Sequence, residues 1–328
     1  MNQFLRHLTP SQQVGLLFVV LFGFLLLASI TTFALSLRER ETERGRARAV
    51  ELAHLGGVLN TSWLIAVVFW MGWASGARVA TLLFAVVAFF ALREFVTLSP
   101  TRRGDHRSLI LAFFVVLPIQ FWLVATARFD LFSVFIPVYV FLAIPVVSAL
   151  ANDPERFLER NAKLQWGIMV CVYGMSHVPA LLLLEFPGWD GRKDAFLVFF
   201  LAFVVQTCMV VQHVAQRLIK RPPRAPLISE SFNWTSWAVG VLAGGVMGAL
   251  LAGITPFQPG SAAAMALIAC VAGTLGHLVM KALKRDRGVT HWGGTVSVTG
   301  ATGLLDRVDA LCFAAPVFFH SVRWYFDL

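Results

Sequence analysis

Residues 233–253 read NWTSWAVGVLAGGVMGALLAG, a stretch of 21 residues without a charged side chain. A hydrocarbon core about 30 Å thick needs roughly 20 apolar residues in a helix that crosses it. Lipid offers no hydrogen-bond partners, so the backbone of such a segment must satisfy itself in a helix or in a closed barrel. The run does not alternate polar and apolar residues, which excludes a barrel strand. The stretch therefore predicts a membrane-spanning helix.

The same pattern recurs along the chain. Of the 328 residues, 58% are hydrophobic and 14% are charged, too few charges to solvate the surface of a water-soluble domain. We expect an all-α, polytopic integral membrane protein with nine or ten transmembrane helices in a single membrane domain, residues 1–328. The second and third spans are short and equally suit a hairpin that does not fully cross. The expected spans are 14–35, 58–74, 78–92, 108–127, 131–150, 164–184, 195–216, 233–253, 263–283 and 305–326.

Basic residues are concentrated in alternate loops. A net charge of +9 would suit a nucleic-acid partner, but its placement follows the positive-inside rule, so we expect no nucleic acid. The rule places the basic loops in the cytoplasm, and we expect the inner (cytoplasmic) membrane of a bacterium. The loops lie within residues 38–48, 93–107, 156–163, 217–224 and 284–287.

Two sets of small residues point to packing. Gly240, Gly244 and Gly248 recur every four residues in one span, which favours close approach of another helix. The four cysteines lie in apolar spans without metal-ligand spacing, so we interpret them as packing residues rather than a disulfide framework or a zinc site. They are Cys171, Cys208, Cys270 and Cys312.

Three histidines lie at membrane depth, where an ionisable side chain is costly. For His177 and His277 we favour a hydrogen bond to a neighbouring helix over a role in a site. His213 lies with two glutamines and Arg217 at the polar end of its span, before a basic loop. An anionic headgroup would sit there, so His213 and Arg217 are candidate substrate-binding residues. Membrane topology alone equally explains a basic loop at this position.

The densest polar segment, residues 281–309, reads KALKRDRGVTHWGGTVSVTGATGLLDRVD. Asp306 and Asp309 are three apart, so on a helix they share a face and could hold one hard divalent cation. The basic start of the segment precedes a Gly-rich stretch that can bring backbone N–H groups to phosphate. Carboxylates, cations and a Gly-rich loop suit phosphate transfer. Equally, acids at a helix N-terminus and cytoplasmic basic residues are ordinary features of a membrane helix.

This segment resembles the C-terminal signature of CDP-diacylglycerol synthases, also called phosphatidate cytidylyltransferases. The resemblance rests on Lys284-Arg285-Asp286 with Gly288-Val289, on GLLDRVD at residues 303–309, and on residues 315–319, which resemble the family's last helix. It implies Mg²⁺-assisted attack by a lipid phosphate on the α-phosphorus of CTP, giving CDP-diacylglycerol and pyrophosphate. Residues 284–309 would then be a cytoplasmic motif segment leading into the last helix. The implied catalytic residues are Asp306, Asp309 and Asp286, the first two also metal ligands, and the implied substrate-binding residues are Lys284, Arg285 and Arg307.

Other features favour a second hypothesis. The family's Lys-Asp falls here on Thr290-His291, its His-Gly-Gly falls on Ala301-Thr302-Gly303, and residues 195–229 contain no acid. The alternative is a non-catalytic relative that binds anionic lipid or supports a membrane complex, so the sequence leaves open whether the chain is an enzyme. A transporter is a third reading, based on buried polar residues that could line a path. The expected partners are CTP, an anionic lipid phosphate and membrane lipids, and a homo-oligomer is left open.

Overall fold

The computed structural model describes residues 10–38, 63, 66–67, 70–71, 74–98, 101–186, 195–219, 221–229, 232–289, 292 and 303–328. Across these residues the chain is helical and forms no β-strand beyond one isolated bridge between Ala225 and Ser229. The predicted all-α fold is confirmed. The chain divides into two compact units, residues 1–76 and residues 77–328.

The first unit contains the long helix α2 (Pro10–Arg38), which includes the predicted span 14–35. Ser29 of α2 accepts a 3.0 Å hydrogen bond from the indole nitrogen of Trp63. The Trp63 ring also stacks on Phe22, with 5.5 Å between ring centroids. The predicted span 58–74 lies partly outside the described residues.

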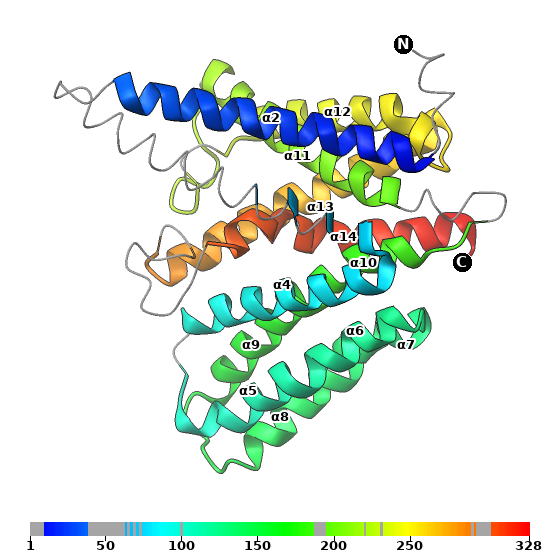
Figure 1. Ribbon diagram of the computed structural model, residues 1–328. Helices are drawn as coiled ribbons and strands as arrows, with labels where there is room; N and C mark the ends of the chain where they lie inside the picture. The colour runs from blue at the N-terminus through cyan, green and yellow to red at the C-terminus, as the bar shows by residue number, and fades with distance from the viewer. Residues whose placement is uncertain are drawn as a thin grey trace. The chain divides into compact units, whose positions relative to one another are not determined.

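The second unit is a bundle of helices (Figure 1). Several segments are continuous rods in which short π-helical turns join α-helices, at η2 (Ala112–Val116), η3 (Phe135–Val140) and η4 (Ile168–Gly174). Their α-helices are α4 (Ala77–Thr97), α5 (His106–Leu111), α6 (Leu117–Ala125), α7 (Phe129–Val134), α8 (Phe141–Ala149), α9 (Phe157–Gly167), α10 (Met175–Ala180), α11 (Ala195–Ile219), α12 (Trp234–Leu250), α13 (Pro259–Asp286) and α14 (Leu305–Phe326). Short 3₁₀ turns are η1 (Arg103–Asp105), η5 (Leu181–Leu183) and η7 (Leu251–Ile254).

Within the described residues, seven helical segments are long and apolar enough to cross a membrane. They correspond to the predicted spans from 78–92 to 263–283. Helix α14 begins and ends at the predicted residues 305 and 326 but is not one of the seven, and the total of nine or ten spans stays a prediction. Helix α13 continues to Asp286, past the predicted end at 283. Its last turn is polar, so hydropathy does not detect it, and the helix ends before Gly288, which has a positive φ.

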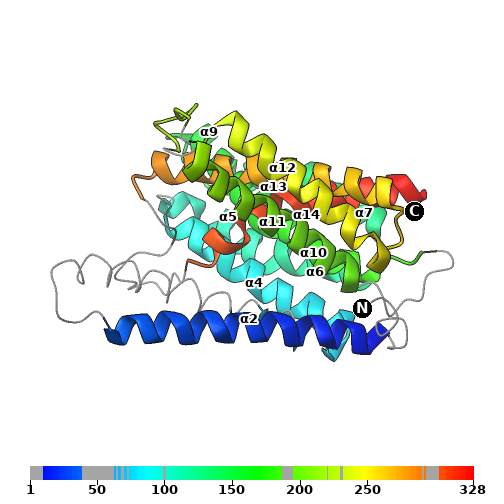
Figure 2. The ribbon, with the colours of Figure 1, turned by 90° about the horizontal axis from the view of Figure 1, so that it is seen from above.

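Helix α13 packs against α11, α12 and α14, and α14 also contacts η4, α10 and α4 (Figures 1 and 2). The glycines of α12 explain the close approach of its neighbours. A Cβ atom on Gly240 would lie 2.7 Å from the carbonyl oxygen of Cys208 on α11, and a Cβ on Gly244 would collide with Cys270 of α13. The predicted small-residue contact is confirmed. All four cysteines are free and buried, as predicted for packing residues.

Glycines also bring α13 close to α14. A Cβ atom on Gly276 would collide with the ring of Phe313, and one on Gly273 would lie 3.1 Å from the carbonyl oxygen of Ala310. The two helices are therefore in near-backbone contact along one side. This contact sets the spacing between polar side chains at the end where α13 stops and α14 starts.

Candidate active site

The polar residues of α13 and α14 form two matched pairs. His277, Lys281 and Lys284 follow one another at steps of four and three, so they share one face of α13. Nδ1 of His277 lies 2.7 Å from Oδ2 of Asp309, and Nζ of Lys284 lies 2.5 Å from Oδ1 of Asp306. The two aspartates predicted from sequence are thus held by side chains from the helix that precedes them.

These pairs are largely shielded from water. The exposed fractions are 3% for the Asp309 side chain, 11% for Lys284 and 19% for Asp306. Charges in such surroundings interact more strongly than charges in water, and each is costly when its partner is absent. The pairs therefore fix the register of α14 against α13.

The start of α14 is held by an acid from a distant helix. Both oxygens of Glu94, near the end of α4, accept backbone N–H groups, from Gly303 at 2.6 Å and from Leu305 at 2.8 Å. The first turn of a helix has unpaired N–H groups and a positive dipole end, so a carboxylate is well placed there. Glu94 is 3% exposed.

A second contact at this end involves Trp292. Its backbone N–H donates to Oδ2 of Asp306 at 2.9 Å, and its ring stacks on Phe95 of α4 at 5.5 Å between centroids. Trp292 is buried. Asp306 is therefore bound by the chain on both of its carboxylate oxygens.

A pocket of about 100 Å³ lies between α11, α13 and the segment that leads into α12. From α13 it is lined by Thr274, His277 and Lys281, and from α11 by Gln212 and His213. His277 belongs to both the pocket and the pair with Asp309, so the pocket adjoins the carboxylates. Lys281 forms no ion pair among the described residues, which leaves a positive charge facing this space.

The predicted site residues fall into two groups. Asp306, Asp309 and Lys284 come together between α13 and α14, and His213 lies at the adjoining pocket. The other four side chains are exposed, and their predicted roles stay predictions. They are Asp286, whose carboxylate lies 3.3 Å from Arg287, and Arg285, Arg307 and Arg217. Thr290, His291 and residues 293–302 lie outside the described residues.

Two residues of the site, His277 and Glu94, are harder to identify as site residues from the sequence. For His277 the sequence favours a hydrogen bond to a neighbouring helix, and the structure contains one. Its partner is the carboxylate of Asp309, a candidate catalytic residue. Glu94 lies just beyond the predicted span 78–92. Its signal was an ionisable residue next to apolar sequence, which in a membrane protein is costly unless it has partners.

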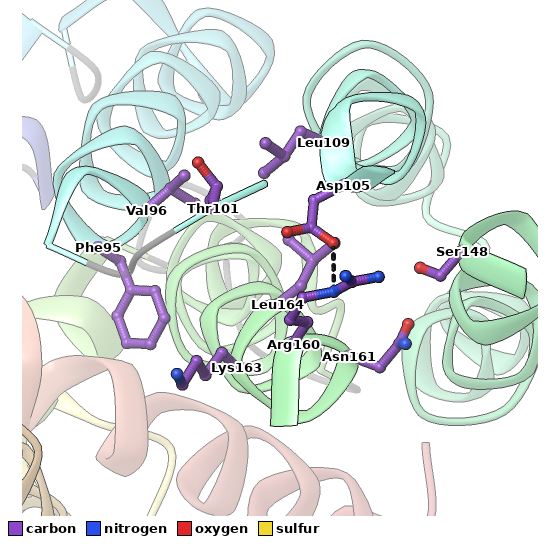
Figure 3. Close-up of a pocket in the computed structure, with 10 residues that line it drawn as sticks. All are labelled: Phe95, Val96, Thr101, Asp105, Leu109, Ser148, Arg160, Asn161, Lys163 and Leu164. Carbon is purple, nitrogen blue, oxygen red and sulfur yellow. Dashed lines mark ion pairs between the residues drawn. The ribbon is translucent and has the colours of Figure 1, made fainter. Parts of the chain in front are cut away.

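A second, smaller pocket of about 20 Å³ lies near the start of α9 (Figure 3). Here Nε of Arg160 lies 3.0 Å from a carboxylate oxygen of Asp105, and the exposed fractions of these side chains are 6% and 11%. Ser148, at the same pocket, shares a 2.8 Å hydrogen bond with Ser108. A space of this size holds about one water molecule. Its buried ion pair therefore supports the junction of α5 and α9, and the larger pocket is the better candidate for a ligand.

The resemblance implies a Mg²⁺ ion held by Asp306 and Asp309. Each oxygen of Asp306 and of Asp309 already accepts one hydrogen bond. No group of three or more His, Cys, Asp or Glu side chains in the described part of the chain could hold a metal ion by itself. Mg²⁺ commonly takes one or two carboxylates and completes its ligands with water and substrate phosphates. Two aspartates therefore fit an ion that arrives with a nucleotide.

Comparison with known proteins agrees with the geometry. The family model described as the cytidylyltransferase family matches residues 57–325. The chain is also 32% identical over 271 residues to a protein of Escherichia coli (strain K12) named "Uncharacterized protein YnbB", covering 81% of this chain and 86% of the relative. The polar cluster at the start of α14 lies within the matched region. The chain therefore belongs to the cytidylyltransferase family, in which CMP is transferred from CTP.

Proposed function

We propose that this protein transfers CMP from CTP to phosphatidate or a related lipid phosphate and so forms a CDP-lipid. The observation that carries the proposal is the α13–α14 cluster, which gathers Asp306 and Asp309 with Lys284 and His277 beside a pocket bearing Lys281. Carboxylates next to cations and a pocket suit phosphoryl chemistry, in which positioning and charge stabilisation do most of the work. The long apolar helices suit a substrate that stays in the bilayer.

In the proposed reaction an oxygen of the lipid phosphate attacks the α-phosphorus of CTP. The bond from that phosphorus to the oxygen bridging to the β-phosphate breaks, and pyrophosphate leaves. Lys281 is the cation of this face without an ion-pair partner in the described residues, so it is available to a phosphate. Lys284 and His277 hold Asp306 and Asp309 in place from α13. Mg²⁺, when bound with the nucleotide by Asp306 and Asp309, would neutralise developing phosphate charge.

The test is CMP transfer by the purified full-length protein in detergent. Labelled CTP, Mg²⁺ and phosphatidate should yield pyrophosphate and a labelled CDP-lipid. Asp309→Asn should reduce the rate at least a hundredfold, since several kcal/mol of charge stabilisation are lost and each 1.36 kcal/mol is about tenfold. Asp327→Asn, at the exposed opposite end of α14, is the matched control and should keep the wild-type rate.

The same assay of CMP transfer tests the predicted role of Asp286. Asp286→Asn should slow transfer if Asp286 is a third catalytic acid, and leave the rate unchanged if its pairing with Arg287 is its whole role. No lipid-dependent pyrophosphate release across several lipid phosphates would contradict the proposed enzyme.

One observation favours a second candidate, a non-catalytic relative that binds anionic lipid. Both aspartates already have a partner on α13, an ion pair with Lys284 for Asp306 and a hydrogen bond with His277 for Asp309, so the fold holds both carboxylates without a metal. Lys281 then remains as a charge for an anionic headgroup. In that case phosphatidate should co-purify with the wild type and be lost in Lys281→Met, while Asp306→Asn combined with Asp309→Asn keeps the bound lipid. Loss of lipid in the double variant would count against this candidate.

A further inference from the structure

The pocket between α11 and α13 contains a polar atom that the fold leaves unpaired. Oε1 of Gln212 is buried and accepts no hydrogen bond from the described residues. Gln212 lines the pocket, as do Gln216 and Ser229. A buried amide oxygen without a partner is costly, and such groups in folded proteins call for an explanation. A rotation of the side chain that turns this oxygen into the pocket, toward a hydrogen-bond donor of a ligand, would supply one and would break no hydrogen bond of the oxygen.

We propose that this pocket binds the cytosine ring of CTP and that Gln212 reads the hydrogen-bonding edge of the base. The inference rests on the proposed use of CTP. Cytosine presents an amino donor beside ring nitrogen and carbonyl acceptors, and a carboxamide presents an acceptor beside a donor. The orientation that complements cytosine places the amide oxygen toward the amino group and the amide NH₂ toward the ring nitrogen, whereas the reversed amide would complement uracil. A phosphate offers mainly acceptors and would leave the amide oxygen unpaired.

The size and lining of the pocket agree with a single ring. Its volume of about 100 Å³ exceeds the ~30 Å³ share of one water in the liquid and is below the ~300 Å³ of pockets that enclose drug-sized ligands. A heterocycle fits and the rest of the nucleotide must lie outside. Phe232 supplies an apolar wall against which a flat ring can pack.

The position of the pocket aligns the remainder of CTP with the cluster. His277 lines the pocket and touches Asp309, and Lys281 lines the pocket one turn further along α13. A base held at Gln212 would therefore direct its phosphates toward Lys281 and the two aspartates. This arrangement accounts for a pocket with neutral hydrogen-bonding groups on the α11 side and a cation on the α13 side.

The experiment compares the binding of labelled CTP and UTP to the full-length protein in detergent. Uracil has a carbonyl in place of the amino group, so the wild type should prefer CTP. Gln212→Met should lower the ratio of CTP to UTP affinity about tenfold, because a paired side-chain contact to a base edge gives at least that discrimination. Competition by tripolyphosphate, which lacks a base, should be unchanged. Gln212→Glu, which retains an acceptor for the amino group, should preserve the preference for CTP.

Controls separate recognition from folding. Gln206→Met, on the exposed side of α11 away from the pocket, should behave as the wild type. The melting temperature of nucleotide-free Gln212→Met should not fall, because the replaced oxygen has no partner to lose. An unchanged CTP-to-UTP ratio in Gln212→Met, or equal binding of the two nucleotides by the wild type, overturns the pocket assignment alone. Absence of CTP binding by the wild type contradicts the proposed function, and the pocket assignment falls with it.

Discussion

At the scale of single residues, burial makes the charged side chains of the cluster depend on their partners. Lys284 and Asp306 are 2.5 Å apart and mostly shielded from water. Removing one member of such a pair is more damaging than removing both, because the remaining charge stays buried without a partner. Glu94, the acid at the start of α14, is also buried, but its partners are the backbone N–H groups of Gly303 and Leu305 rather than a charged side chain.

Glu94→Gln is therefore expected to destabilise the protein. Both carboxylate oxygens of Glu94 accept backbone N–H groups, and an amide can replace only one of them, since its NH₂ group would face a donor. The loss should be about 1–3 kcal/mol, the usual cost of leaving a buried donor unpaired. Unfolding of the variant in a detergent–SDS mixture measures it. Glu155→Gln, at an exposed loop acid, is the control, and equal stability of both variants would contradict the role given to Glu94.

Part of this site could be predicted from the sequence. The spacing of Asp306 and Asp309 places them on one helical face, and the basic residues before them indicate an anion. The sequence does not indicate that Lys284 forms an ion pair with Asp306 while Lys281 forms none among the described residues, because that depends on how α13 and α14 pack. Glu94 reaches the site across more than two hundred residues of chain, a contact that no local pattern encodes.

At the scale of elements, α13 shows how a helix end fixes a functional segment. Gly288 has a φ of +68°, its N–H donates to Arg285, and the N–H of Val289 donates back to Lys284 at 3.0 Å. This is a Schellman ending, in which a glycine in the left-handed region closes the last turn. The ending lies directly after Lys284, so it supports the side chain that holds Asp306.

Gly288→Ala should lower stability by about 1 kcal/mol, because a Cβ atom disfavours the left-handed conformation. Space is not the cause, since nothing lies within 4 Å of a Cβ built there. Gly260 gives a matched control in the first turn of the same helix, where φ is not positive and the space is also open. Gly260→Ala should be neutral or stabilising. Opposite signs for the two variants in thermal unfolding confirm the explanation, and equal destabilisation contradicts it.

The loop before α9 predicts a dependence on pH. Partial desolvation raises the pKa of Asp153, but the hydrogen bond from Arg160, the backbone N–H of Glu155 and the nearby Arg102 outweigh it and hold the pKa below the ordinary 3.8. A lowered folded-state pKa means that the ionised form stabilises the fold above the unfolded pKa. This contribution is lost as the pH falls through the lower, folded-state pKa.

Asp153→Asn should thus lower the melting temperature near pH 7, and its difference from the wild type should shrink below about pH 4, the ordinary range for an aspartate. Melting curves measured from pH 7 down to the acid limit of the protein test this. Asp130→Asn, at a fully exposed acid in the first turn of α7, should show a smaller difference at neutral pH. A difference for Asp153→Asn that persists or grows at low pH would have the wrong sign.

The helices themselves were predicted well where hydropathy decides. The spans from 78–92 to 263–283 correspond to described helices, because a long apolar run leaves the backbone no alternative in lipid. Helix α14 also begins and ends at the predicted residues. The ends were less accurate where helices continue into polar sequence, as in the last turns of α13 and α11. Hydropathy also carries no signal for the π-helical turns at η2, η3 and η4, which depend on packing around single residues.

At the scale of the whole molecule, charge is sorted between the two ends of the second unit. Arg102, Asp153 and Glu155 link the segments before α5 and before α9 at one end. Further basic residues at these two segments and the helix turns beside them are Arg103, Arg107, Arg156, Arg160 and Lys163. The connection between α6 and α7, at the other ends of the same rods, contributes only Arg128. An uneven distribution of Lys and Arg across loops sets the orientation of a membrane protein.

We therefore expect the loop that contains Glu155 to face the cytoplasm and the start of α7, which contains Asp130, to face the opposite side. Both side chains are exposed, and the four native cysteines are buried, so a cysteine introduced at either position should dominate labelling. In right-side-out membrane vesicles, an impermeant maleimide should label Asp130→Cys and spare Glu155→Cys. Detergent should make both reactive. Labelling of Glu155→Cys before detergent would invert the orientation and place the α13–α14 cluster away from cytoplasmic CTP, which would contradict the proposed reaction as well.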